Sequence, residues 1–275
     1  MIRRLLAKGF MLALGLCLFL TANQTAFGVE PAPSNPEAPQ NSYLTAIARV
    51  VCYNPAYTRG SPIISGSGSI WQVNGQNWLL TNNHVLEAAS TYGLTCDTHL
   101  VQDFQAAVDD YRAAIEENKV LVYEVDPEGF YQSTLRGDDL AFAKVIEVPS
   151  GSPLSLLDHV ALRPNVERCS ARFPIGTPLR VLGYPGIGAM FLPTMTEGII
   201  ASLDKEGDVY YYLTSAKIES GNSGGLALTE DLSCVVGIPT YVAVGEVESL
   251  GRILVLTEEE IAGMLSSVAP EVGVD

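Results

Sequence analysis

The chain has 275 residues, of which 47% are hydrophobic, so it carries enough apolar side chains for a large core and does not have the composition of a disordered chain. Its formal net charge of −15 argues against a nucleic-acid partner and against binding to anionic lipid. The same charge favours solubility.

The first residues have the pattern of an export signal. Arg3, Arg4 and Lys8 precede the apolar run Phe10–Leu20, which is shorter than the roughly 20 residues of a membrane span, and a small-residue cleavage site fits before Val29. We expect a signal peptide over residues 1–28 and a secreted or periplasmic protein; a retained membrane anchor stays an alternative. Removal of the signal leaves 13 basic against 31 acidic residues, a net charge of −18, so no membrane partner is expected.

Residues 29–42 are rich in proline and polar residues, which is typical of a flexible linker. Beyond them, many short strand-like runs alternate with Gly, Pro and Asp, a pattern that predicts an all-β sandwich or barrels. The segment SGSGSIWQVNGQNWLLTNNHV predicts a hairpin, because Asn74-Gly75 is a strong signal for a tight turn between two strands.

Two segments have a helical pattern. Phe104, Val108, Tyr111 and Ile115 recur at helical spacing, so we expect one amphipathic helix, inserted in a loop, whose apolar face packs on the core. Near the end, residues 257–267 predict a short helix with Thr257 as N-cap and a glutamate three positions later.

Four cysteines remain once Cys17 leaves with the signal: Cys52, Cys96, Cys169 and Cys234. Four cysteines allow three pairings, and an even number in an exported chain favours disulfides. We favour Cys52–Cys96 and Cys169–Cys234, because each pair would lie within one half of the chain; free buried thiols are the alternative. No C-x-x-C spacing occurs, so a zinc site is not expected.

Three patches have the residues that acyl transfer by a serine requires: a nucleophile, a base and an acid that orients the base. His84 ends an apolar strand in TNNHV, Asp139 precedes an apolar strand in DDLAF, and Ser223 lies among glycines in GNSGG. Each of these segments alone also has a purely structural explanation. His84 could be a structural histidine at the end of a strand, Asp139 a turn residue, and the glycines around Ser223 a tight turn. Asp138 competes with Asp139 as the acid of such a triad.

The order of these three patches along the chain resembles that of the trypsin-like serine proteases of the chymotrypsin fold, and within them the bacterial Deg/HtrA-type peptidase domain. The resemblance covers about residues 45–245 and implies two antiparallel six-stranded β-barrels, at about 43–160 and 161–256, with the site between them. It implies that His84 is the general base, that Asp139 orients it, and that the N–H groups of Gly221 and Ser223 form an oxyanion hole. It implies protein or peptide substrates and no metal or cofactor.

The sequence departs from the family at several points. Asn222 precedes the serine where trypsin has an acid that pairs with a newly cut N-terminus, and no PDZ module is expected after residue 267. By the resemblance, Lys217, Ile238 and Thr240 line the substrate site. Lys217 could select an acidic residue before the scissile bond, or its charge could lie outside a pocket that takes apolar residues. The expected function is an exported serine endopeptidase; a catalytically silent binding module is the main alternative, and an esterase is disfavoured because its strand–turn–helix serine motif is absent.

Overall fold

The computed structural model describes residues 42–56, 62–132, 139–148, 151–186, 191–244 and 249–268. The expected signal peptide and nearly all of the expected linker lie outside these ranges, as does Asp138. No helix within the described ranges has both the length and the apolar character needed to cross a membrane.

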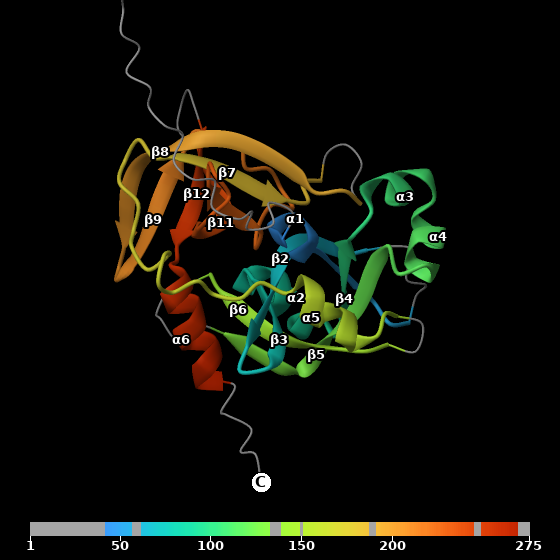
Figure 1. Ribbon diagram of the computed structural model, residues 1–275. Helices are drawn as coiled ribbons and strands as arrows, with labels where there is room; N and C mark the ends of the chain where they lie inside the picture. Colours follow the sequence, from blue (N-terminus) through green and yellow to red (C-terminus); the bar gives the residue numbers. More distant parts are fainter. Residues whose placement is uncertain are drawn as a thin grey trace, which may run out of the picture. The chain divides into compact units, whose positions relative to one another are not determined.

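Twelve strands form two closed antiparallel barrels, which confirms the expected fold class (Figure 1). The first barrel has the strand order β1-β2-β3-β6-β5-β4, and the second has the order β10-β11-β12-β9-β8-β7. The strands are β1 (Ile47–Tyr53), β2 (Ile64–Val73), β3 (Gln76–Thr81), β4 (Thr95–Val101), β5 (Val120–Gln132), β6 (Ala141–Ile146), β7 (Pro178–Gly183), β8 (Thr194–Glu206), β9 (Val209–Thr214), β10 (Leu226–Thr229), β11 (Val235–Val244) and β12 (Ser249–Val255). The helices are α1 (Ser42–Ala46), α2 (Asn83–Tyr92), α3 (Phe104–Asp109), α4 (Tyr111–Glu116), η1 (Leu154–Leu156), α5 (Leu157–Val160) and α6 (Glu258–Val268).

The hairpin β2–β3 leads directly to the first candidate residue of the site. Asn74 and Gly75 both have positive φ, 51° and 72°, which a two-residue turn between right-twisted strands requires. The turn closes the antiparallel pairing of β2 with β3, in which Val73 is opposite Gln76. On its other side, β3 pairs with β6. The end of β3 at Thr81 therefore lies at a fixed position on the barrel rim, three residues before His84.

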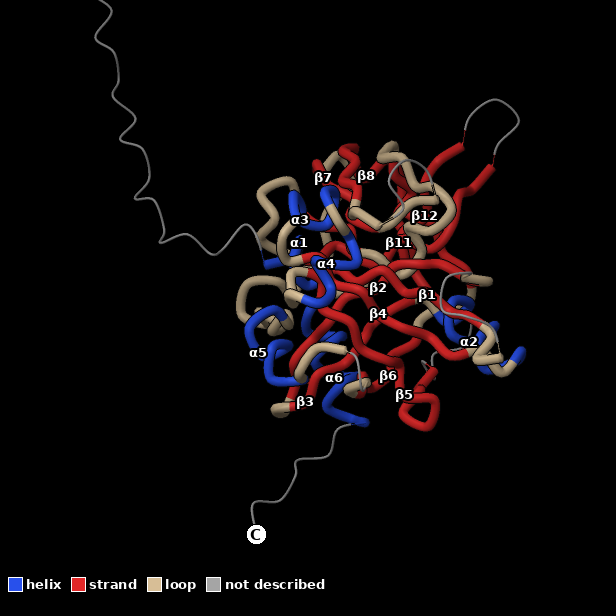
Figure 2. The backbone as a smooth tube through the Cα atoms, turned by 90° about the vertical axis from the view of Figure 1, so that its right-hand side faces the viewer, coloured by secondary structure: helices blue, strands red, loops and turns tan. Residues whose placement is uncertain are grey.

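The helical insertion differs from the prediction of one helix. It consists of α3 and α4, which follow one another between β4 and β5 (Figure 2). Asp110 breaks the helix: its backbone is extended, and its side chain accepts hydrogen bonds from the N–H groups of Arg112 and Ala113 as an N-cap. Val108 lies before the break, in α3, and is 53% exposed, so it is not part of the apolar face; Ala107 is the buried residue of that helix.

The remaining apolar residues of the insertion pack as expected. Phe104, Tyr111 and Ile115 lie against a small buried cluster that also contacts Leu192, which comes from the second barrel. The ring of Tyr111 stacks on His99 and lies 5.2 Å from the ring of Phe191, centroid to centroid. The insertion therefore contacts both barrels.

One apolar cluster joins the barrels. Trp71 and Trp78 of the first barrel share it with Leu226 and Ile238 of the second, and Ile261 of α6 packs on the same cluster. Figure 1 shows α6, in red, alongside the first barrel although it follows the last strand of the second. This shared core fixes the two barrels against each other, which a site built from both of them needs.

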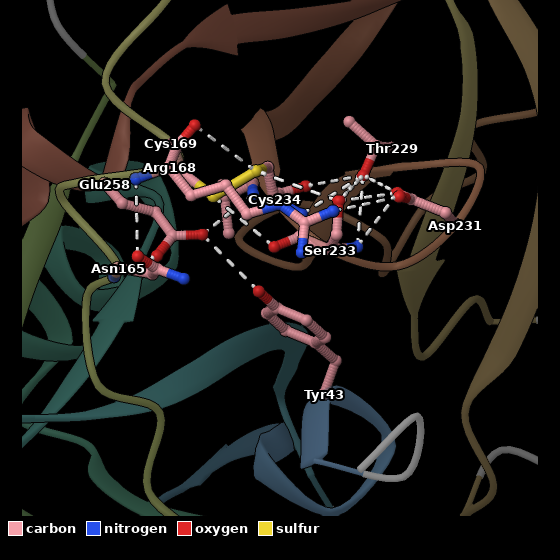
Figure 3. Close-up of a disulfide and its surroundings, with 10 residues drawn as sticks. Tyr43, Asn165, Arg168, Cys169, Thr229, Asp231, Ser233, Cys234 and Glu258 are labelled. Atoms are coloured by element: carbon pink, nitrogen blue, oxygen red, sulfur yellow. Dashed lines mark hydrogen bonds and ion pairs between the residues drawn. A yellow bond between two sulfur atoms is a disulfide. The ribbon is translucent and has the colours of Figure 1, made fainter. Parts of the chain in front are cut away.

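Two disulfides are present, and they are the pairs that the sequence favoured. Cys52 and Cys96 are register partners on β1 and β4, and Cys169–Cys234 ties the segment before β7 to the start of β11. Beside the second disulfide, the carboxylate of Glu258 is 1% exposed and accepts hydrogen bonds from the N–H groups of Asn165, at 2.6 Å, and Val235, at 3.0 Å (Figure 3). The disulfide and this buried carboxylate hold the inter-barrel segment, β11 and α6 together.

Candidate active site

His84 stands at the start of α2, directly after the rim of the first barrel. Asn82 has extended backbone dihedrals at the N-cap position, and its side-chain Nδ2 donates a 2.6 Å hydrogen bond to the carbonyl oxygen of Asp139. This bond joins the segment that carries His84 to the segment that leads into β6. It requires the contact of two segments 57 positions apart in sequence.

His84 and Asp139 form a hydrogen-bonded pair. Oδ2 of Asp139 lies 2.7 Å from Nδ1 of His84, and Oδ1 accepts a 3.0 Å hydrogen bond from the backbone N–H of the same histidine. The imidazole side chain is 51% exposed and the carboxylate 23% exposed. The carboxylate thus fixes the ring from one side, and Nε2 is left for a partner on the other.

Two structural features require glycine at positions around Ser223: backbone conformation and close packing. Gly221 and Gly224 have φ values of 98° and 85°, in the region that L side chains rarely adopt. A Cβ at Gly221 would collide with the carbonyl oxygen of Tyr184, and one at Gly224 with the carbonyl oxygen of Ser67. The nearest neighbours at both positions include backbone atoms of this chain, so the glycines allow a close approach of backbone to backbone.

Within the segment Gly221–Gly225, two N–H groups have no acceptor among the residues that the structure describes: those of Gly221 and Ser223. Their preceding carbonyls are both held inside the fold, since the Ser220 oxygen accepts from Gly186 N–H at 2.7 Å and the Asn222 oxygen from Gly225 N–H at 2.9 Å. In a trans peptide the N–H points away from the C=O. Both N–H groups are therefore directed away from those bonds and are available to an anion.

The hydroxyl of Ser223 does not bond to His84 in this structure. It donates a 2.6 Å hydrogen bond to the carbonyl oxygen of Thr240. That carbonyl belongs to a bulge in β11, where Pro239 pairs with Ile253 and Tyr241 with Arg252 while Thr240 is left between them. A rotation about the Cα–Cβ bond of Ser223 would turn the hydroxyl from Thr240 to another acceptor.

The loop of Ser223 lies against the segment that leads to His84. A Cβ on Gly224 would collide with the Thr81 hydroxyl and lie 3.0 Å from the backbone nitrogen of Asn82. A Cβ on Gly66 would lie 2.9 Å from a methyl of Val85 and 3.5 Å from the carbonyl oxygen of Ser223. The neighbours of His84 and of Ser223 in sequence are thus in contact across the two barrels.

The three residues expected to line the substrate site are in different surroundings. Lys217 is exposed, and its carbonyl oxygen accepts a 2.7 Å hydrogen bond from the Thr196 hydroxyl. Ile238 is fully buried in the cluster between the barrels. Thr240 is 1% exposed, and its hydroxyl donates to the carbonyl oxygen of Arg252 at 3.2 Å.

Sequence reasoning missed one residue that contacts the site from the first barrel. Ser67 is fully buried, and its hydroxyl donates a 2.6 Å hydrogen bond to the carbonyl oxygen of Gly221. Nothing in SGSGSI distinguishes it from its neighbours Ser65 and Ser69, because its partners are far away in sequence.

Within the described ranges, no group of three or more His, Cys, Asp or Glu side chains could hold a metal ion. The other two histidines stand apart from the pair formed by His84 and Asp139: His99 lies on β4 beside Tyr111, and His159 on α5. The arrangement is capable of proton transfer through a carboxylate-oriented imidazole and of holding an oxyanion at two backbone N–H groups.

Comparisons with known proteins show the family to which the chain belongs. The family described as trypsin-like peptidase domain matches residues 66–238, so the chain belongs to that family and is a protease that acts on proteins or peptides. A serine endoprotease from Yersinia pestis has a similar structure, with a TM-score of 0.53, 20% sequence identity, and coverage of 85% of this chain and 68% of that one. At this identity the likeness concerns the chymotrypsin-like fold. No curated protein matches the chain.

Proposed function

We propose that this chain is an exported serine endopeptidase that cleaves peptide bonds through an acyl-enzyme intermediate. The observation that carries the proposal is the hydrogen-bonded pair formed by His84 and Asp139. Residues next to His84 in sequence contact, across the barrels, a serine loop in which two N–H groups have no acceptor among the described residues. General base, orienting acid, nucleophile and oxyanion donors are the parts that acyl transfer needs.

In the proposed mechanism, Ser223 turns from Thr240 toward His84 when substrate binds. Nε2 of His84 takes the hydroxyl proton as Oγ attacks the scissile carbonyl, and the N–H groups of Gly221 and Ser223 stabilise the oxyanion. His84 then gives the proton to the leaving amine, and an acyl ester remains on Ser223. Water, deprotonated by His84, hydrolyses the ester and restores the enzyme.

A signal peptide over residues 1–28 and a secreted or periplasmic location are part of the proposal. The two disulfides support it, because such bonds persist in oxidising compartments.

One observation favours the alternative of a silent binding module: the hydroxyl of Ser223 is engaged by Thr240 and not by His84. Catalytic hydrogen bonds often form only with substrate bound, so this geometry is compatible with an enzyme.

The test is cleavage-site profiling on a mixed peptide library, with Ser223→Ala as the matched variant. We expect internal cleavage by the wild type and none by the variant. Binding of peptides without any cleavage by the wild type would support the silent module instead.

A further inference from the structure

The hydroxyl of Ser67 connects the first barrel to two segments of the second. It donates to the carbonyl oxygen of Gly221 at 2.6 Å and accepts from the backbone N–H of Tyr184 at 2.7 Å. The backbone N–H of Ser67 also donates to the carbonyl oxygen of Ser223, at 2.8 Å. Three hydrogen bonds from one fully buried residue therefore surround the candidate oxyanion loop.

Gly221, like the other glycines of this loop, has little intrinsic constraint on its backbone. It lies between two peptide groups, and without a Cβ it can adopt many φ and ψ values, so its own chain does not fix either peptide plane. The structure fixes both from outside: Gly186 N–H holds the Ser220 carbonyl, and the Ser67 hydroxyl holds the Gly221 carbonyl. The first bond fixes the peptide plane that carries the Gly221 N–H, and the second fixes the plane that follows it.

The second bond of the Ser67 hydroxyl reaches the segment whose Gly186 N–H holds the Ser220 carbonyl. Tyr184, whose N–H it accepts, is two residues before Gly186 in the segment that follows β7. The carbonyl oxygen of Tyr184 is also so close to Gly221 that a Cβ there would collide with it. Ser67 therefore positions both the loop and the segment that supports it.

We propose that Ser67 is a positioning residue, whose hydroxyl keeps the Gly221 N–H directed toward the transition-state oxyanion; this rests on the proposed serine-protease function. Loss of the hydroxyl leaves the part-buried Gly221 carbonyl and the buried Tyr184 N–H without this partner. These groups can find new partners only if the loop moves, and such a movement turns the Gly221 N–H. The loss is therefore one of transition-state stabilisation, with ground-state binding of substrate little changed.

The variant Ser67→Ala removes the hydroxyl and keeps the Cβ. The matched control is Ser69→Ala on the same strand, since Ser69 is also fully buried and accepts a 2.9 Å hydrogen bond from the Trp71 indole N–H. For Ser67→Ala we expect kcat to fall about 10- to 100-fold with KM nearly unchanged, which is less than the loss of a whole donor. For Ser69→Ala we expect a loss of stability with kcat unchanged.

A peptide aldehyde, whose adduct with the serine carries the oxyanion, supplies the readout that a merely structural role would not change. Its affinity should fall in parallel with kcat/KM in Ser67→Ala and stay unchanged in Ser69→Ala. The affinity for an uncleaved peptide should be the same in Ser223→Ala and in the double variant with Ser67→Ala. The pH at which activity is lost in acid should not shift, because among the described residues no hydrogen bond joins the Ser67 side chain to His84 or Asp139.

Equal kcat values for Ser67→Ala and Ser69→Ala would overturn the positioning role while leaving the protease function intact. So would a fall in kcat/KM without a fall in aldehyde affinity. An inactive wild type would overturn the protease function and this role with it. If Ser67→Ala does not fold, Ser67→Cys decides: its thiol is a weaker donor, so kcat and aldehyde affinity should fall together to a smaller extent, and wild-type values of both would overturn the proposal.

Discussion

The carboxylate of Asp139 binds His84 twice: Oδ1 accepts the backbone N–H at 3.0 Å, and Oδ2 lies 2.7 Å from the ring atom Nδ1. A carboxylate only accepts, so the proton of a neutral imidazole in this position is on Nδ1 and the lone pair is on Nε2. The backbone bond matters as much as the ring bond, because it dictates which oxygen faces the ring.

Asp139→Asn should lower kcat by about 10⁴-fold with little change in fold. The backbone N–H of His84 needs an acceptor, so the amide oxygen takes the place of Oδ1 and the amide NH₂ faces Nδ1. Nδ1 must then accept, and the proton moves to Nε2, where it blocks proton abstraction from the serine. The measurement is kcat on a peptide substrate for the purified variant.

Asp138→Asn is the control for that prediction, and we expect a mild effect from it. A larger loss in Asp138→Asn than in Asp139→Asn would show that the wrong aspartate has been assigned.

Removal of either disulfide should lower the free energy of unfolding by about 2–5 kcal/mol. The two closed loops span 44 and 65 residues, so their chain-entropy terms differ little. Double Cys→Ala variants of each pair avoid free thiols, and urea unfolding with a common slope measures the loss. Variants as stable as the wild type, or four free thiols in protein from an oxidising compartment, would contradict the prediction.

The stability contributed by Glu258 should decline as pH rises. Burial raises the pKa of this carboxyl above its usual range, although hydrogen bonds from the N–H groups of Asn165 and Val235 and from the Tyr43 hydroxyl oppose the shift. The folded state then holds the proton more tightly than the unfolded chain does. The resulting stability is fully present below the usual glutamate pKa and is lost as pH rises through the folded-state pKa.

Glu258→Gln cannot titrate, so the stability advantage of the wild type over this variant should be larger at about pH 4 than at about pH 7. Thermal unfolding across this range measures it, with the exposed neighbour in Glu259→Gln as the control. An advantage that grows with pH would mean that the hydrogen bonds outweigh burial and that the pKa is lowered.

An apolar residue before the scissile bond should be preferred to an acidic one. The Lys217 side chain is exposed and can keep its charge in water, while the next residue, Ile218, is buried against Gly251. The measurement is kcat/KM for matched peptides ending in Glu, Val or Arg, with wild type and Lys217→Ala. A preference for Glu that Lys217→Ala abolishes would show that the lysine selects substrate by charge.

Local signals predicted much of the fold. Asn74-Gly75 gave a two-residue turn, because few other residues accept positive φ at both positions. Thr257 and Glu260 form the reciprocal pair of hydrogen bonds expected at the start of α6, at 2.8 and 3.2 Å. His84 and Asp139 were paired from family order alone, and the structure places them in hydrogen-bond contact.

Other features depend on contacts that no local pattern contains. In the sequence, Asp110 is compatible both with the polar face of one long helix and with the N-cap of a second helix. The break goes with the packing of Tyr111 against His99 and Phe191, which a local sequence pattern does not contain. The bond between Ser67 and Gly221 joins residues 154 positions apart. The acceptor for the Ser223 hydroxyl is the carbonyl oxygen of Thr240, which lies in a β-bulge. The position of this bulge depends on the register between β11 and β12.

The central claim is that Ser223 is a nucleophile activated by His84. Labelling with a fluorophosphonate, followed by peptide mapping, tests it most directly. We predict a single covalent adduct on Ser223 in the wild type, none in Ser223→Ala, and labelling slowed by about 10³-fold or more in folded His84→Ala, because members of such a triad act as a unit. An adduct on another residue, or folded wild-type protein that does not react, would contradict the claim.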